Sequence, residues 1–175
     1  MSGTAGASIH ASAVLVGARA VLIRGPSGAG KSRLAFDLIL AGRTGQIPPA
    51  VLVGDDRVHL WTSAGQLMVG PAPQLSGLIE VRGLGIRRCA FAAEAPLGLV
   101  VDLAALDAER LPPPEKLLAR LHGVEVPRIP VESGFAALPL VVAILTTTKG
   151  TENASFSTDC AKGIGNHMRP SIATE

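Results

Sequence analysis

The sequence predicts an α/β fold in which helices flank a mixed β-sheet that carries a phosphate-binding loop. The first observation is residues 25–32, which read Gly-Pro-Ser-Gly-Ala-Gly-Lys-Ser, the P-loop pattern. The second is their setting, because the apolar run 20–23 precedes them and apolar residues at helical spacing follow. The third is a set of further short apolar runs, at 13–16, 51–53 and 97–101, which predict buried strands. Some runs are joined by glycine turns, so antiparallel strands are expected beside the parallel ones.

The P-loop supplies the candidate nucleotide-binding residues. They are Gly25, Pro26, Ser27, Gly28, Ala29, Gly30, Lys31 and Ser32. The glycines let backbone N–H groups point toward an anion, and the dipole of the following helix adds positive potential there. In this pattern the Lys31 ammonium reaches the β- and γ-phosphates and the Ser32 hydroxyl ligates Mg²⁺. The helix is expected to end near Gly42, followed by a loop at 43–49.

Composition and charge exclude several classes of function. The 175-residue chain is 47% apolar with a mean hydropathy of +0.38, so we expect it to fold. Aromatic residues make up 3% and the net charge is +2, which argues against nucleic-acid binding through base stacking or a basic patch. The longest apolar stretch, 135–145, is about half of a membrane span. We therefore expect a cytoplasmic protein that binds neither nucleic acid nor membranes.

The chain is expected to form a single folded domain. We predict a flexible N-terminus at 1–9, a P-loop kinase domain at 10–148 and a disordered tail at 149–175, which is polar and aperiodic. Cys89 and Cys160 lie far apart without metal-ligand spacing, which indicates a reducing compartment.

Acidic residues that follow predicted strands are candidates for metal binding and proton transfer. Asp55 and Asp56 come directly after a short apolar run. Successive side chains of an extended segment alternate, so one carboxylate can face Mg²⁺ while the other acts as general base. Glu80 and Arg82 share a face if residues 78–86 are extended. They then either serve a metal and a phosphate or form an ordinary surface ion pair.

The remaining segments predict a second hairpin and several less certain elements. Apolar runs at 58–62 and 66–69 flank a glycine turn. Prolines precede a short predicted helix at 115–121. Segment 124–131 alternates but contains prolines, so it is an edge strand or an extended arm. Segment 135–145 is either a packed helix or a strand.

Taken together and in this order, the motifs resemble the catalytic domain of bacterial HPr kinase/phosphorylase over residues 10–145. The P-loop is one match, and a histidine fifteen residues before its first glycine, His10, is another. The Asp-Asp-Arg-Val at 55–58 is the third. The fourth, Ile-Glu-Val-Arg-Gly-Leu-Gly-Ile at 79–86, is distinctive for this family.

The resemblance implies a Mg²⁺-dependent serine kinase that uses ATP and acts on an HPr-like phosphocarrier of the phosphotransferase system. It also implies a fold like that of HPr kinase and PEP carboxykinase. Lys31 and the loop amides would hold the nucleotide phosphates, and Ser32 and Glu80 would ligate the metal. A reverse reaction would take inorganic phosphate and release pyrophosphate. The family's usual assembly is a hexamer.

The same resemblance implies the catalytic residues. Asp55 or Asp56 would supply the base that takes the proton of the serine hydroxyl, with Asp56 favoured. His10 would lie in the active site, although by itself a histidine near a terminus indicates a surface residue. Arg82 would support transfer in both directions, and Arg110 would contact the transferring phosphate.

Several segments depart from the family pattern. The chain looks like a short form that lacks the family's N-terminal domain, and the loop at 43–49 is extra. The segment 131–136 has no arginine where the family's late segment carries them, which bears on the phosphorylase activity. The family's C-terminal helix is not recognised after Leu145, which bears on partner binding and on the hexamer.

Three other functions are weighed against the kinase. A small-molecule kinase of the P-loop type would carry a closing lid rich in arginine, and no such cluster is present. A GTPase would carry a guanine-reading Asn-Lys-x-Asp stretch, which is absent. A regulatory module that binds nucleotide without catalysis is favoured by the altered late segment and opposed by the intact acidic and P-loop residues.

Overall fold

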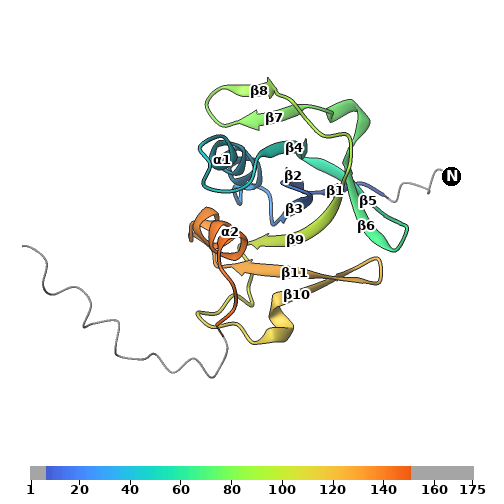
Figure 1. Cartoon of the computed structure of the whole chain (residues 1–175). Coiled ribbons are helices and arrows are strands. Elements are labelled where there is room, and N and C mark those ends of the chain that lie inside the picture. The colour runs from blue at the N-terminus through green and yellow to red at the C-terminus, as the bar shows by residue number, and fades with distance from the viewer. Residues whose placement is uncertain (1–6, 151–175) are drawn as a thin grey trace, which may run out of the picture.

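The computed structural model describes residues 7–150, which form a nine-stranded mixed sheet, a separate two-stranded ribbon and two α-helices (Figure 1). The strands are β1 (Ile9–His10), β2 (Ser12–Val16), β3 (Arg19–Arg24), β4 (Ala50–Gly54), β5 (Arg57–Ser63), β6 (Gln66–Pro71), β7 (Leu78–Val81), β8 (Gly85–Arg88), β9 (Ala95–Leu103), β10 (Leu118–Leu121) and β11 (Val124–Val131). The helices are α1 (Lys31–Arg43) and α2 (Ala137–Thr146), with 3₁₀ turns at Pro73–Leu75 and Pro114–Leu117. Strands β7 and β8 form the ribbon.

Strand β9 organises the sheet. The strand order is β1-β5-β6-β9-β3-β2-β4, and β11 also pairs with β9. The first residues of β9 pair antiparallel with β6, and Val100–Leu103 at its other end pair parallel with β11. Strand β3 runs parallel to β9 as well. The carboxyl ends of β3, β9 and β11 therefore meet at one edge, where ligands commonly bind in α/β sheets.

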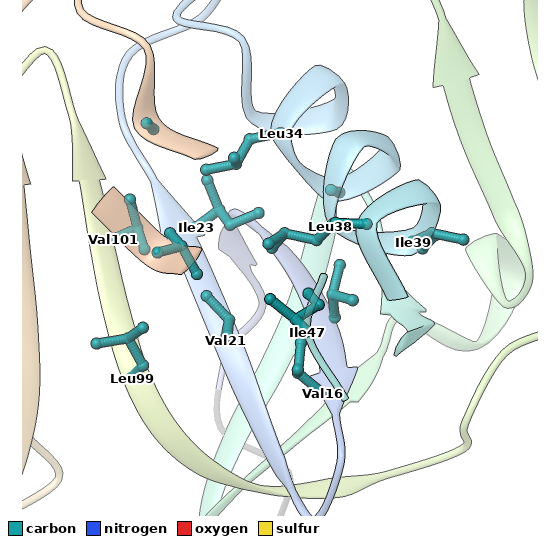
Figure 2. Packing of buried hydrophobic residues seen from close by; sticks show 14 of the residues in the cluster. Val16, Val21, Ile23, Leu34, Leu38, Ile39, Ile47, Leu99 and Val101 are labelled. Carbon is teal, nitrogen blue, oxygen red and sulfur yellow. The ribbon is translucent and has the colours of Figure 1, made fainter. Parts of the chain in front are cut away.

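Alternating side chains place a core on each face of the sheet. Ile23 and Val101 face α1 and α2, where they pack in a cluster that includes Leu38 of α1 and Val141 of α2. Figure 2 shows this cluster under α1. The neighbouring residues Leu22 and Val100 point the other way, because successive residues of a strand face opposite sides. There the sheet curls over itself, and residues of β5, β6, β10 and β11 cover the second cluster.

The predicted mixed α/β fold is confirmed, as are its two hairpins. Strands β2 and β3 pair antiparallel, as do β5 and β6, and the helix after the P-loop ends at Arg43. Segment 135–145 is mainly helical, as α2. No helix among the described residues is long and apolar enough to cross a membrane. Most of the tail predicted at 149–175 lies outside the described residues, and so does Cys160.

One predicted element is wrong. The expected helix at 115–121 is a single 3₁₀ turn followed by β10, because residues 118–121 pair antiparallel with β11. Segment 124–131 is a strand, β11, whose first half pairs with β10 and whose second half pairs with β9. The registers pair each residue of this strand on one side only, so Pro127 and Pro130 occupy positions with an open edge, as the edge-strand prediction requires.

Candidate active site

The P-loop connects β3 to α1 at the carboxyl edge of the sheet. It approaches β9 so closely that a Cβ on Gly25 would lie 2.9 Å from the carbonyl oxygen of Leu103. Only glycine avoids this clash. Gly28 and Gly30 have φ of 78° and 96°, in the left-handed region that glycine adopts readily. Gly30 caps α1, so the helix begins at Lys31 with its amides directed into the loop.

Lys31 is buried beneath this loop. Its ammonium donates hydrogen bonds to the carbonyl oxygens of Gly25, at 3.0 Å, and Pro26, at 2.9 Å. An ammonium has three donors, so these two bonds leave one for an anionic ligand. The charge is therefore held at the loop before any phosphate arrives, which suits a P-loop lysine.

Asp55, at the end of β4, is the centre of a buried hydrogen-bond network. Ser12 of β2 donates to Asp55 Oδ1 at 2.5 Å, and Ser32 of α1 donates to the same oxygen at 2.9 Å. The backbone N–H of Glu80 in β7 donates to Oδ2 at 3.1 Å. Asp55 is 2% exposed and Ser12 is fully buried, so donors from three elements replace water around this carboxylate.

Asp56 has the opposite environment although it is the next residue. The Arg57 N–H donates to the Asp55 carbonyl oxygen at 2.8 Å, which closes a three-residue turn around Asp56 at φ 65°. The side chain of Asp56 is 65% exposed, and its Oδ1 lies 3.3 Å from Nε2 of His10. His10 reaches this position because β1 pairs with the start of β5. The two aspartates thus diverge through a tight turn and not through strand alternation.

Glu80 and Arg82 do not share a face. Strand β7 ends at Val81, and the chain reverses through a turn in which the Leu84 N–H donates to the Val81 carbonyl oxygen at 2.9 Å. Arg82 lies in this turn and is exposed, while Glu80 lies opposite Ile86 in the ribbon. The extended same-face arrangement expected from the sequence is therefore wrong.

Arg110 is the last of the predicted catalytic residues. It is exposed, in the loop that joins β9 to the second 3₁₀ turn. Among residues 7–150 the structure gives no hydrogen bond or ion pair from its guanidinium to the P-loop or the acidic pair. Its predicted contact with a transferring phosphate stays a prediction.

The structure also shows an ion network that motif analysis missed. Arg24, the residue before the P-loop, binds both carboxylate oxygens of Asp102 at 2.7 Å. Arg128 of β11 donates to Asp102 at 2.6 Å and to both oxygens of Asp107 at 2.7 and 2.9 Å. Arg24 and Asp102 lie near the carboxyl ends of β3 and β9, and Arg128 lies on the neighbouring β11, so strand order would have been the signal for finding them.

The network perturbs the titration of its members. Burial raises the pKa of Asp102, but hydrogen bonds from Arg24 and Arg128 outweigh it, and the pKa lies below its ordinary value. Hydrogen bonds from Arg128 hold the pKa of Asp107 at about 2. The hydrogen bond to Asp107 in turn raises the pKa of Arg128. All three groups therefore stay charged at neutral pH.

The arrangement around Asp55 suits a divalent cation bound together with phosphates. Ser32 directly follows the P-loop lysine. Its hydroxyl and the Asp55 carboxylate are hard oxygen ligands that lie 2.9 Å apart. Mg²⁺ is commonly held by one or two such protein oxygens, with phosphates and water completing its shell. The residues present therefore fit the metal that the P-loop predicts, and Glu80 is adjacent through its backbone.

Comparisons with known proteins give a consistent picture. Residues 4–159 match the family model of the HPr Serine kinase C-terminal domain. The HPr kinase/phosphorylase of Mycoplasma mycoides is 28% identical over 84% of this chain and 49% of its own length. That of Enterococcus faecalis is 36% identical over 73% of this chain and 43% of its own. The chain thus spans about half or less of these relatives.

A solved structure agrees with the fold. The structure of the Hpr(Ser) kinase/phosphatase from Coxiella burnetii superposes with a TM-score of 0.62 at 25% identity, over 78% of this chain and 86% of that one. The family resemblance inferred from the motifs is therefore confirmed. Because the family match covers most of the sequence and the fold agrees with it, the chain belongs to the family of HPr serine kinase C-terminal domains.

Proposed function

We propose that this chain is a P-loop serine kinase that transfers the γ-phosphoryl group of ATP to a serine hydroxyl of an HPr-like phosphocarrier protein. The observation that carries the proposal is the pair of consecutive aspartates with opposite environments beside the P-loop. Asp55 is buried and bound to Ser32, whereas Asp56 is exposed and contacts His10. One carboxylate can bind a metal while its neighbour takes a proton. The similarity to the HPr kinase/phosphorylases supports the same activity.

In this proposal the P-loop and the buried aspartate bind the nucleotide. Loop amides and the Lys31 ammonium bind the phosphates, and the loop glycines allow the backbone to approach them. Ser32 and Asp55, with Glu80 nearby, would hold Mg²⁺. When bound, the metal would neutralise charge on the β- and γ-phosphates. Ser12 keeps a donor on Asp55 if Ser32 turns toward the metal.

Asp56 is the proposed general base. Its exposed carboxylate accepts the proton of the incoming serine hydroxyl as the serine oxygen bonds to phosphorus and the bond to the nucleotide's bridging oxygen breaks. His10 Nε2, 3.3 Å away, orients the carboxylate and can share the proton. In the reverse reaction inorganic phosphate attacks the phosphoserine, the protonated Asp56 returns its proton to the serine oxygen, and pyrophosphate forms. Such a kinase would meet its carrier in the cytoplasm.

The test is a phosphate-transfer assay with two matched variants. The protein is incubated with Mg²⁺, ATP and HPr, and phosphoserine is measured by mass. We expect Asp56→Asn to keep Mg²⁺-dependent ATP affinity but lose transfer, by about 100-fold or more. Asp55→Asn should weaken ATP binding in Mg²⁺ much more than in EDTA.

The outcomes separate the alternatives. ATP binding without transfer to HPr by the wild-type chain would reject the kinase and favour the regulatory module. Full transfer activity in Asp56→Asn would reject Asp56 as the base. The reverse reaction is tested by incubating the protein with phosphorylated HPr and inorganic phosphate and measuring the pyrophosphate that forms.

A further inference from the structure

The β7–β8 ribbon carries exposed apolar and basic side chains beside the proposed catalytic groups. Leu84 is 70% exposed and Ile86 is 63% exposed. Arg87 and Arg88 are exposed as well, and within residues 7–150 no acidic side chain forms an ion pair with either. Residues 81–89 contain three arginines and no acid. A surface that combines exposed apolar side chains with unpaired arginines is typical of a binding region and not of an ordinary solvated hairpin.

The strand register places part of this surface directly beside Glu80. Glu80 pairs with Ile86, and Leu78 pairs with Arg88, so these four residues share one face of the ribbon. Side chains opposite one another in such a pair have Cβ atoms about 5 Å apart. The other face carries Ile79, which is 2% exposed and packs in the cluster under α1. The face with Glu80, Ile86 and Arg88 therefore points away from the core.

The same ribbon is tied to the catalytic centre. The Glu80 N–H binds Asp55, which also accepts the hydroxyl of Ser32. An acceptor that brings a hydroxyl group to phosphates bound at the P-loop therefore approaches close to the Glu80 face. A small acceptor would have no group to place on Ile86 or Arg88, whereas a protein presents neighbouring side chains along with its serine.

We propose that Ile86 and Arg88 form a docking surface for the protein substrate, which places an apolar and an acidic side chain next to its target serine. This rests on the proposed kinase function and deepens it by assigning the surface that recognises the carrier. The apolar contact supplies affinity through buried area, and the acidic group meets basic residues that lack a carboxylate partner within the described chain.

The test compares two double variants of the same design. In the first, Ile86→Ser is combined with Arg88→Glu on β8. In the control, Leu118→Ser is combined with Arg120→Glu on β10, where an exposed leucine and an exposed arginine also stand two residues apart. Strand β10 lies at the opposite end of the molecule in Figure 1. Steady-state kinetics are measured with HPr and ATP, and ATP binding is measured separately to verify folding.

We expect the β8 variant to raise KM for HPr by about tenfold or more, since about 1.4 kcal/mol of binding free energy is a factor of ten. Its kcat should stay within about threefold and its ATP affinity should be unchanged, because neither residue belongs to the P-loop or to the groups around Asp55. The β10 variant should match the wild type. Raising the salt concentration should raise KM for the wild type more than for the β8 variant.

Three results would overturn the proposal. They are an unchanged KM in the β8 variant, an equal rise in the β10 variant, and a drop in oligomeric mass on sedimentation in the β8 variant alone. The last would make the ribbon an interface between copies of this chain. If the wild type binds ATP but forms no phosphoserine on HPr, the kinase function itself fails, and the docking proposal is rejected with it. The two failures are distinguishable. Failure of the kinase function appears in the wild type as absence of phosphoserine, whereas failure of the docking proposal appears in the KM values of the variants.

Discussion

Replacing Ser12 by alanine removes one of three donors from a carboxylate that water does not reach. The Ser12 hydroxyl lies 2.5 Å from Asp55 Oδ1, Ser12 is fully buried and Asp55 is 2% exposed. A hydrogen bond to a charged group contributes about 1.5–3 kcal/mol to stability. Ser32 and the Glu80 amide remain as donors, so the loss should lie near the middle of that range, at about 2 kcal/mol. For a domain of this size that corresponds to a Tm lower by about 4–8 °C.

The assay is urea unfolding of Ser12→Ala beside a matched control. Ser76→Ala makes the same substitution at a hydroxyl whose hydrogen bond, to the Pro73 carbonyl oxygen, is exposed. The control should change the free energy of unfolding by less than about 0.5 kcal/mol. Because Ser12 also fixes the orientation of Asp55, its variant should in addition lose ATP affinity in Mg²⁺ and not in EDTA. A Ser12→Ala protein as stable as the control would refute the reasoning, since the buried carboxylate would then not depend on this donor.

Two further predictions concern Lys31 and the ion network of Asp102 and Asp107. Lys31→Ala should lower phosphoserine formation by about 100-fold or more, because it removes the cation held at the phosphates, while circular dichroism stays native; wild-type turnover would reject the P-loop assignment. Asp102 and Asp107 have pKa values below those of the unfolded chain, so their contribution to stability is present above about pH 4 and is lost as the pH falls toward 2. Asp107→Asn should therefore lose less stability than the wild type between pH 5 and pH 2.5 in urea titrations, and equal losses in both proteins would contradict the role of Asp107.

Local patterns in the sequence were sufficient for the P-loop and its flanking elements. The strand before Gly25 and the helix after Gly30 are specified by neighbouring residues, and so are the hairpins closed by glycine turns. The turn that contains Arg82 is also encoded locally, because Gly83 and Gly85 adopt φ of 90° and 83° and reverse the chain. The alternation of apolar and charged residues at 78–82 favoured an extended segment over the turn that these glycines indicate.

What could not be predicted depends on pairs that are distant in the chain. Ser12 lies 43 residues from Asp55, and Glu80 lies 25 residues from it on the other side. Neither hydrogen bond follows from a motif, because each arises from how β2, β4 and β7 come together. Strand β10 was missed for a similar reason, since its pairing with β11 overrides the helical tendency of 115–121.

The resting position of Lys31 has a consequence for how a nucleotide would enter. An ammonium in solution must shed tightly held water before it can contact a phosphate. Lys31 is already dehydrated, with the Gly25 and Pro26 carbonyl oxygens standing in for two waters. Capture of a phosphate then uses the third N–H of a cation whose position the two loop carbonyls already fix. The loop carbonyls replace solvent around the ammonium, so nucleotide entry does not require desolvation of a mobile side chain.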